Sequence, residues 1–414
     1  MTLMKTSMLS AVATLIKILS GFIITKVIAV YIGPSGLALI GQLQNFIMLV
    51  KTVAGDFLKT AITKYTAEYE NDENKKYDLW SSSFKLAFIL NFVVLVGLIY
   101  FSNDLSYYLF HTLEYAFVFK ILAISLPFFV SNTILLAILN GQKQIKQYIF
   151  LNIVLSIVSL FIVVILSVLY EVKGTLVAYV VSQAIVFFIT LIYLRKETWL
   201  KLKLFLFSVR KENIKKLLGF AIITLSAVLA SNTSMIYIRN YISDTYSMSD
   251  AGYWQGVWLL SQVALSLITT SLATYFLPTL SVLTNKKALN KELTNAIYIV
   301  IPIAIVISLS MYFLREYIII VLYSDQFMPM SQLFLWQMVG NVIKVLGWLF
   351  GYVLVAKAMV KYTVTTEILF AVIFIVSSIY FMRLYGLVGV TYAYATSSLL
   401  HLIVVSFIYK FKVD

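Results

Sequence analysis

Apolar runs of about twenty residues recur along the whole chain, and short polar segments separate them. A helix of this length is able to cross the hydrocarbon core of a bilayer. The pattern therefore predicts an all-α integral membrane protein with twelve transmembrane helices. They are expected at residues 8–30, 36–60, 82–101, 115–139, 147–169, 174–194, 217–240, 252–277, 295–314, 331–355, 361–382 and 386–409.

Composition supports this class and removes several functions. The chain is 61% hydrophobic and only 12% charged, which is not the balance of a soluble globular protein. It contains no cysteine, and its two histidines, His111 and His401, lie in distant segments, so neither thiol chemistry nor a histidine metal site is expected. The sequence has no phosphate-binding GxxxxGKS or GxxxxGKT loop. We expect no metal, no cofactor and no enzymatic activity.

Lysine and arginine are unevenly distributed between the polar connections. If the amino terminus is cytoplasmic, 21 of them fall in cytoplasmic segments, and only Lys173, Arg315 and Arg383 fall on the opposite side. The positive-inside rule then places both termini in the cytoplasm. The formal net charge of +14 follows mainly from this topology, so it gives no reason to expect a nucleic-acid partner.

The longest polar connection follows the sixth predicted helix and divides the chain into halves. We expect an amino-terminal lobe at 1–200, a basic cytoplasmic linker at 201–216 and a carboxy-terminal lobe at 217–414. Similar segments recur 215 residues apart, such as Gly174-Thr-Leu-Val-Ala-Tyr179 and Gly389-Val-Thr-Tyr-Ala-Tyr394. A repeat in the same orientation is typical of transporters that consist of two parallel six-helix bundles.

Basic residues lie inside or at the ends of several predicted helices, although a cation near the bilayer centre costs about 2.5–3.5 kcal/mol. Such side chains are expected to face a water-filled cavity, and a cavity that is lined with cations suits an anion. The candidate substrate-binding residues are Lys17, Lys26, Lys51, Lys59, Arg239 and Lys344.

Some of these charges also have a structural interpretation. Lys26 is near the outer end of its helix, from which its ammonium is able to reach the interface. Lys17 and Lys26 lie on opposite faces of a straight helix, so they share a face only if the helix breaks, and Gly21 is the expected place. Asp56 and Lys59 are three residues apart and are able to pair with each other on the second helix.

The remaining candidates differ in depth. Arg239 lies at the outer end of the seventh helix and is equally well interpreted as an interface anchor. Lys344 lies in the middle of the tenth helix, close to the small residue Gly340. We expect Lys17, Lys51 and Lys344 to line one water-filled cavity, because all three are far from the ends of their helices.

Two further groups inside the helices are candidates for a role. Asp56 and Glu367 are the only carboxylates within the predicted spans, and an intramembrane carboxylate is a candidate for coupling to an ion or proton. Glu367 is preferred, because no basic residue lies three or four positions away. Aromatic residues such as Trp254 and Trp258 lie near a helix end and are interpreted as an interfacial belt, with a platform for sugars as the alternative.

Several segments along the chain carry a family resemblance. They include Gly33-Pro-Ser-Gly36, Thr63-Lys-Tyr65, Trp254-Gln-Gly256, Leu277-Pro-Thr-Leu-Ser281 and Phe350-Gly-Tyr352, and the match extends over essentially the whole length. Through them the chain resembles the Wzx-type flippases, most closely the enterobacterial branch that includes the common-antigen lipid III flippase. That family belongs to the multidrug/oligosaccharidyl-lipid/polysaccharide exporter (MOP) superfamily, whose MATE-like fold is two six-helix lobes around a central cavity.

The resemblance implies a function and a setting. Members move undecaprenyl-pyrophosphate-linked oligosaccharide, such as an O-antigen unit or common-antigen lipid III, from the cytoplasmic to the periplasmic leaflet of the bacterial inner membrane. The implied partners are this substrate, the membrane lipids, and a periplasmic polymerase and chain-length regulator of the same pathway. The basic residues on matching motif positions are Lys17, Lys26, Lys64 and Lys344, whereas Lys51, Asp56 and Lys59 depart from the common-antigen branch. The type of glycan therefore stays open.

Two other functions are weighed against this one. A drug/cation antiporter of the same fold is expected to line its cavity with carboxylates, but basic residues in or near the spans outnumber acidic ones by eight to two. A membrane glycan polymerase or ligase needs a large outer loop, and the outer loops reach only about 15 residues. We therefore expect a secondary transporter of a lipid-linked anion that works by alternating access.

Overall fold

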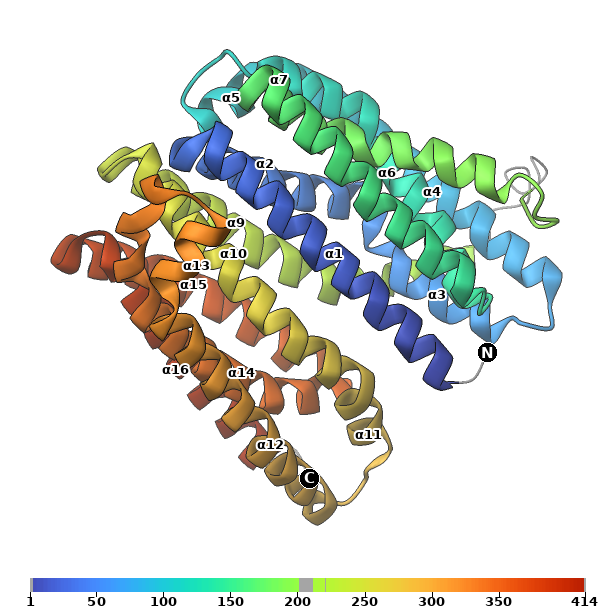
Figure 1. Cartoon of the computed structure of the whole chain (residues 1–414). Helices are drawn as coiled ribbons and strands as arrows, with labels where there is room; N and C mark the ends of the chain where they lie inside the picture. Colours follow the sequence, from blue (N-terminus) through green and yellow to red (C-terminus); the bar gives the residue numbers. More distant parts are fainter. Residues whose placement is uncertain (1–2, 201–210, 220, 413–414) are drawn as a thin grey trace. The chain divides into compact units, whose positions relative to one another are not determined.

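A computed structural model describes residues 3–200, 211–219 and 221–412 (Figure 1). These residues form helices joined by short connections and contain no β-strand, so the predicted all-α class is confirmed. The chain divides into two compact units. Unit 1 consists of Met1–Ile32 and Gln42–Val228, and unit 2 consists of Gly33–Gly41 and Leu229–Asp414.

The first half of the chain supplies the helices of unit 1. They are α1 (Leu3–Tyr31), the later part of α2 (Gly33–Lys51), α3 (Leu58–Glu68), α4 (Glu73–Tyr100), α5 (Ser102–Phe110), α6 (Ala116–Gly141), α7 (Ile145–Leu194) and α8 (Lys211–Gly219). The start of α2 belongs to unit 2 because it packs tightly there: a Cβ on Gly252 would lie 1.9 Å from the carbonyl oxygen of Pro34.

The second half supplies the helices of unit 2. They are α9 (Ala221–Thr245), α10 (Met248–Ser271), α11 (Leu277–Val282), α12 (Lys286–Phe313), α13 (Arg315–Leu322), α14 (Phe334–Ala356), α15 (Val360–Tyr385) and α16 (Gly389–Lys412). Short π-helical and 3₁₀ segments interrupt both units, at Thr52–Asp56, Leu272–Phe276, Asp325–Leu333 and Gly386–Val388.

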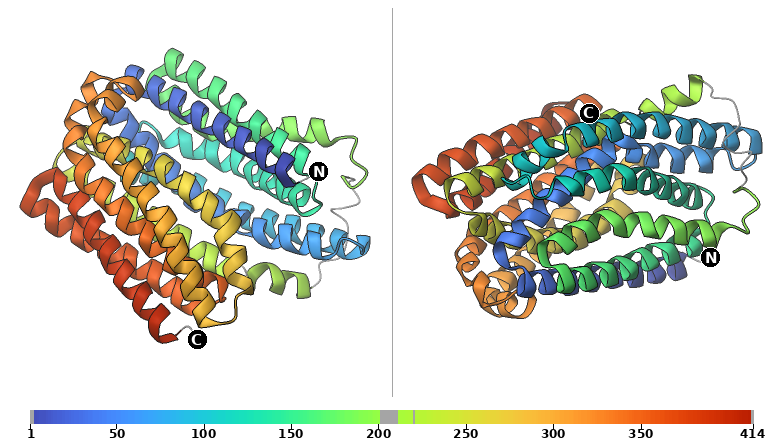
Figure 2. Two further views of the ribbon diagram at one scale, coloured as in Figure 1. Left: turned by 60° about the horizontal axis from the view of Figure 1, so that its bottom comes forward. Right: turned by 90° about the horizontal axis from the view of Figure 1, so that it is seen from above.

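The long helix α7 is an antiparallel hairpin (Figure 2). The backbone of Glu171 adopts a non-helical conformation, with a φ of 49°, where the chain turns. The two ends of the hairpin lie side by side, as the hydrogen bond from the side-chain amide nitrogen of Gln147 to the carboxylate of Glu197 at 2.8 Å shows. The turn packs so closely that a Cβ on Gly174 would lie 2.1 Å from the carbonyl oxygen of Leu166.

The pair α15 and α16 forms the corresponding hairpin of unit 2. Gly386 turns the chain with a φ of 64°, and a Cβ on Gly389 would lie 2.3 Å from the carbonyl oxygen of Phe381. Gly174 and Gly389 therefore have the same packing role, as their offset in the sequence predicts for a duplicated chain.

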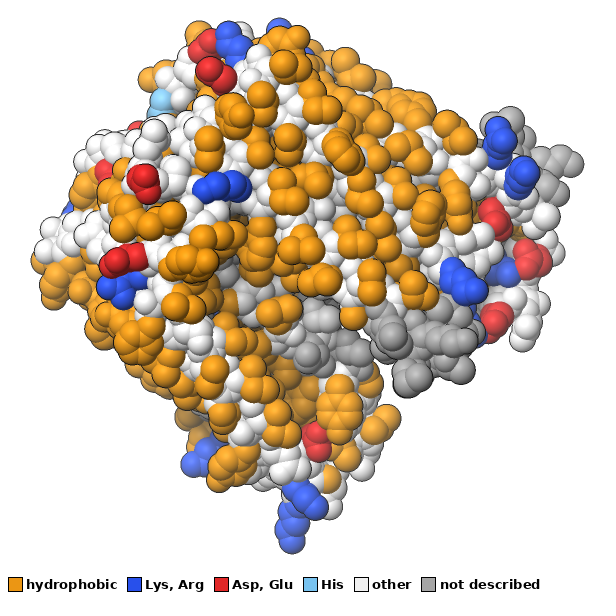
Figure 3. Space-filling model, viewed as in Figure 1, with side chains coloured by type: hydrophobic (Ala, Val, Ile, Leu, Met, Phe, Trp, Pro, Cys, Tyr) orange, Lys and Arg blue, Asp and Glu red, His pale blue; other side chains and the backbone are white. Residues whose placement is uncertain are grey.

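Among the described residues, eight helical segments are long and apolar enough to span a membrane, or nine if the bent pair of α8 and α9 is counted as one span. Two of the eight, Ile145–Leu194 and Val360–Lys412, are the hairpins, and each is long enough for two crossings. With both halves of each hairpin counted, and with α9 and α10 included, the helices are consistent with the predicted twelve crossings. Apolar side chains cover much of the surface in Figure 3, as expected for helices that face lipid.

The predicted linker and lobe boundaries stay predictions. Residues 201–210 of the linker lie outside the described residues, and the linker's last residues form the first part of α8. The boundary between the two compact units falls after Val228, within α9.

Helix α1 continues without a break through Gly21. Lys17 and Lys26 therefore lie on opposite faces of one helix. Lys17 is exposed and Lys26 is half-buried.

The break instead occurs after α2, at Gly55. Its φ of 135° is available to glycine and strained for other residues, and it lies in a π-helical turn. This turn brings Asp56 back to Lys51, with 3.2 Å between the carboxylate oxygen and the ammonium nitrogen. The pairing of Asp56 with Lys59 that regular helical spacing favours does not form, and Lys59 is exposed.

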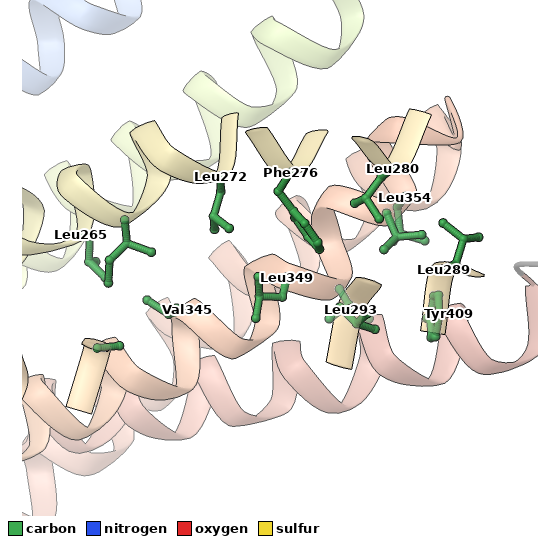
Figure 4. Close-up of a cluster of buried hydrophobic side chains, with 14 residues drawn as sticks. Leu265, Leu272, Phe276, Leu280, Leu289, Leu293, Val345, Leu349, Leu354 and Tyr409 are labelled. Atoms are coloured by element: carbon green, nitrogen blue, oxygen red, sulfur yellow. The ribbon is translucent and has the colours of Figure 1, made fainter. Parts of the chain in front are cut away.

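A cluster of buried apolar side chains joins α10, α11, α12, α14 and α16 (Figure 4). Leu272, Phe276 and Leu349 lie in its centre, and Leu265 and Val345 lie at one end. Because Val345 is fully buried in this cluster, the rotation of α14 about its axis is fixed, and with it the direction of the neighbouring Lys344.

Candidate functional site

Lys344 and Glu367 line the same pocket inside unit 2, although they are far apart in the sequence. The pocket has a volume of about 200 Å³. Helices α9, α10, α14, α15 and α16 each contribute to its wall. This pocket is the candidate functional site.

The ammonium of Lys344 faces aromatic rings. Its nitrogen lies 3.3 Å from the centre of the Phe370 ring and 6.0 Å from that of Trp348, and the side chain is only 7% exposed. Among the described residues, Lys344 has no hydrogen-bond acceptor and no ion pair. A cation–π contact stabilises such a cation only partly, and a buried charge without a counter-ion is costly. The pocket is therefore suited to receive an anion.

Glu367 is the nearby negative charge. It is half-buried on α15 and close enough to Lys344 for their charges to interact. Phe370 lies one turn further along α15, and the centre of its ring lies 3.3 Å from the ammonium nitrogen of Lys344 and 5.5 Å from the centre of the His401 ring. Three ionisable groups from three helices thus gather around one aromatic ring.

Aromatic side chains form the opposite part of the wall. The ring of Trp258 stacks on Phe374 at 6.3 Å between centres and meets the ring of Tyr394 edge-on at 5.4 Å. Trp254 is fully buried beside Trp258. The interpretation of these tryptophans as an interfacial belt is wrong, because α10 turns both of them toward the interior of unit 2. The alternative, an aromatic platform, agrees with their position.

Small and polar residues of α14 hold this wall in place. The hydroxyl of Tyr394 and the side-chain oxygen of Asn341 are hydrogen-bonded at 3.2 Å, and the amide of Asn341 donates to Ser261 at 3.2 Å. A Cβ on Gly340 would lie 2.4 Å from the Tyr394 ring, so glycine at this position makes room for the ring. The small, polar face that the sequence shows around Lys344 therefore positions the pocket wall.

Arg239 occupies a different place in unit 2. Its side chain is 1% exposed, its guanidinium donates to the side-chain oxygen of Gln255, and it lies 5.7 Å from the centre of the Trp254 ring. Gln255 in turn packs against Gly41, where a Cβ would lie 2.5 Å from its amide carbon. The interpretation of Arg239 as an interface anchor is therefore wrong, and Arg239 is not among the residues that line the pocket of Lys344.

The other basic candidates belong to unit 1. Lys51 is paired with Asp56, and Lys64 is exposed with its ammonium 4.8 Å from the centre of the Tyr65 ring. Lys17, Lys26 and Lys59 lie on α1 and α3 as described above. Their contribution to substrate binding stays a prediction.

Phe370, Phe374 and Tyr394 are among the wall residues that sequence reasoning missed. Phe370 and Phe374 follow Glu367 at helical spacing, so a search for aromatic residues on the helical face of Glu367 would have found them. Tyr394 belongs to the repeated segment that begins at Gly389, and that pattern indicates duplication without indicating a site.

Two units with helices of membrane-spanning length, a helical hairpin in each unit, and an internal pocket whose lysine has no ion pair among the described residues are features of a membrane transporter. A family model described as "Polysaccharide biosynthesis protein" matches residues 3–284, and the chain belongs to this family.

Relatives support the same assignment. The chain is 28% identical over 404 residues to the lipid III flippase of Escherichia coli K12, which covers 97% of this chain and 96% of the relative, and the same values hold for that of Shigella flexneri. The fold is that of the MOP superfamily. An inward-facing MATE multidrug transporter superimposes with a TM-score of 0.83 at 15% identity, covering 96% of each chain. The lipid II flippase MurJ gives 0.77 at 16% identity, covering 97% of this chain and 87% of MurJ. The resemblance and the fold class expected from the sequence are confirmed.

Proposed function

We propose that this protein is a flippase for an oligosaccharide linked to undecaprenyl pyrophosphate, and that it moves this lipid from the cytoplasmic to the periplasmic leaflet of the inner membrane. The observation that carries the proposal is the buried Lys344, which has no ion pair within the described residues. Its support comes also from the likeness to lipid III flippases over nearly the full length of both chains and from the shared fold with MurJ.

In this proposal the pyrophosphate lies against Lys344. A pocket of about 200 Å³ is smaller than a pocket for a whole drug-sized molecule, which takes about 300–1,000 Å³, and so suits one charged group of a larger substrate. Lysine binds phosphate as a point charge without the two-pronged geometry of arginine, which favours release after transport. The aromatic wall of Trp258 and Tyr394 then faces the first sugar.

Transport is proposed to follow alternating access of two lobes, 1–200 and 217–414, with both termini in the cytoplasm. A cavity that Lys17, Lys51 and Lys344 line together, with Lys26, Lys59, Lys64 and Arg239 as further contacts, belongs to the same proposal. The protein acts as a transporter without enzymatic activity. Glu367, with Asp56 as the alternative, is the proposed site of coupling to an ion gradient. A periplasmic polymerase and chain-length regulator are its proposed partners.

A drug/cation antiporter is the second candidate, and the likeness to MATE transporters favours it at the level of fold. Lys344 argues against it, because it is the more deeply buried of the two charges that line the pocket and its ammonium repels a cationic drug, whereas the half-buried Glu367 would attract one.

A deletion strain separates these functions. We expect undecaprenyl-pyrophosphate-linked oligosaccharide to accumulate, as detected by mass spectrometry, and surface glycan to disappear, with both restored by the wild-type gene. Unchanged lipid-linked intermediates together with drug sensitivity would support the antiporter instead.

A further inference from the structure

A second pocket, with a volume of about 360 Å³, lies in unit 1, far along the chain from every residue of the candidate site. It forms where α3 and α6 end, where α4 begins, and where the two ends of the α7 hairpin meet. The volume is within the range of small-molecule sites, about 300–1,000 Å³. The distribution of lysine and arginine predicts that this end of the helices is cytoplasmic, the side from which a flippase is loaded.

Several buried polar atoms of this pocket have no partner. Trp199 lines the pocket and is 5% exposed, yet its indole N–H has no acceptor among the described residues. The side-chain oxygens of Gln142 and Gln144, which also line the pocket, are buried and have no donor within the described part of the chain. Buried polar groups in native proteins are nearly always hydrogen-bonded. A ligand that both donates and accepts hydrogen bonds would satisfy all three groups.

The charges of the pocket argue against phosphate and against a metal ion as its ligand. Glu70 pairs with Lys143 at 2.6 Å, and Glu73 pairs with Lys76 at 2.5 Å. The carboxylate of Glu197 accepts from two glutamine amides, at 2.8 Å and 3.3 Å. Because three carboxylates face two lysines, the pocket repels a phosphate. Because all three carboxylates already have partners, a metal ion would have to displace them, and no group of metal ligands occurs among the described residues.

The rings of Tyr77 and Trp199 line the pocket, and the ring of Trp80 packs behind them. The buried Trp80 donates its indole N–H to the hydroxyl of Thr66 at 2.9 Å, and its ring lies 5.6 Å from the ring of Trp199 and 5.3 Å from that of Tyr77. Flat apolar rings beside carboxylate, amide and indole groups offer contacts to the two sides of an uncharged sugar: its C–H face and its hydroxyls.

We propose that this pocket is a binding site for a neutral sugar. In the flippase, it would bind a sugar of the glycan during loading and so select among glycans. This physiological role rests on the proposed function, whereas sugar binding itself does not.

Binding is measured on the purified full-length protein by saturation-transfer NMR, in a detergent without a sugar headgroup. The probes are glucose, galactose, rhamnose, N-acetylglucosamine and N-acetylgalactosamine, with inorganic pyrophosphate as the anionic probe. We expect saturable binding of at least one sugar.

Two variants test the pocket. Glu197→Gln removes a charged acceptor while keeping its shape, and Trp199→Phe removes the N–H while keeping a ring. Each substitution should weaken the binding of the sugar about tenfold or more. Glu316→Gln, at an exposed glutamate of unit 2, should bind like the wild type.

Two results overturn the proposal: no sugar of the panel binds the wild type, or both pocket variants bind as the wild type does while keeping its melting temperature. Binding of pyrophosphate that depends on Glu197 would also overturn it. Because the probes carry no lipid, a failure here is distinct from a failure of the flippase proposal, which the deletion strain tests. If Trp199→Phe does not fold, Glu197→Gln decides the outcome.

Discussion

Lys344 of unit 2 and Lys51 of unit 1 were both predicted to line a cavity, and the structure gives them different surroundings. Lys51 is 20% exposed and pairs with Asp56 at 3.2 Å. Lys344 is more deeply buried, faces aromatic rings, and has no ion pair among the described residues. The depth of a lysine within a span therefore does not decide its role.

The counter-ion explains the difference. A charge that is already paired gains little from a ligand, because the ligand must replace the pair. An unpaired buried charge gains a full electrostatic partner in a medium of low dielectric constant. We therefore expect Lys344 to contribute more to substrate binding than Lys51, whose charge is already balanced by Asp56.

The largest expected effect comes from removing the unpaired charge. We expect Lys344→Ala to abolish surface-glycan export without loss of protein from the membrane, because the pyrophosphate loses its cation. Lys344→Arg should be partly active, since it keeps the charge and changes its geometry. Export is measured by immunoblot of the surface glycan, beside Lys291→Ala as a control at an exposed lysine of α12. Normal export by the alanine variant would mean that this lysine is only structural.

The next effect concerns the backbone that makes the Lys51–Asp56 pair. The φ of 135° at Gly55 would strain the backbone of any other residue at this position. A Cβ there would also lie 3.0 Å from a methyl carbon of Val130. We expect Gly55→Ala to lower the free energy of unfolding by about 1–3 kcal/mol, seen as a lower melting temperature in detergent. Gly21→Ala is the matched control, because nothing lies within 4 Å of its Cβ. An unchanged melting temperature for Gly55→Ala would show that the turn is not under this constraint.

The smallest effect separates the two carboxylates. Glu367 faces the unpaired Lys344, whereas Asp56 is held by Lys51. We expect Glu367→Gln to lose the stimulation of lipid flipping by an imposed pH gradient, and Asp56→Asn to keep it, in liposomes with purified protein. If Glu367→Gln retains full gradient-stimulated transport, Glu367 is not the coupling site.

The helices could be predicted from the sequence because lipid demands that every backbone group be paired within its own helix. The break of α7 at Glu171 falls between the two predicted spans 147–169 and 174–194, because polar residues interrupt the apolar run there. The length of an apolar run also predicts how deep a residue lies in the membrane. Lys344 is in the middle of such a run, so its charge is predicted to face away from the lipid.

Contacts between helices could not be predicted in this way, because they depend on how each helix is rotated. Glu367 showed no basic neighbour on its own helix, yet α15 packs it near Lys344 of α14. Trp258 showed only its closeness to a helix end, yet α10 turns it into the pocket. The pairing of Asp56 with Lys51 depended on a glycine φ that helical spacing does not reveal.

Binding of undecaprenyl pyrophosphate without sugar tests the central claim most directly. The purified wild type is compared with Lys344→Met, which removes the unpaired charge, and with the double variant Lys51→Met/Asp56→Asn, which neutralises the ion pair as a whole. We predict at least about tenfold weaker binding for Lys344→Met, as for the loss of a hydrogen bond to a charged group, and binding near the wild-type value for the double variant. Equal binding by Lys344→Met and the wild type would contradict the account.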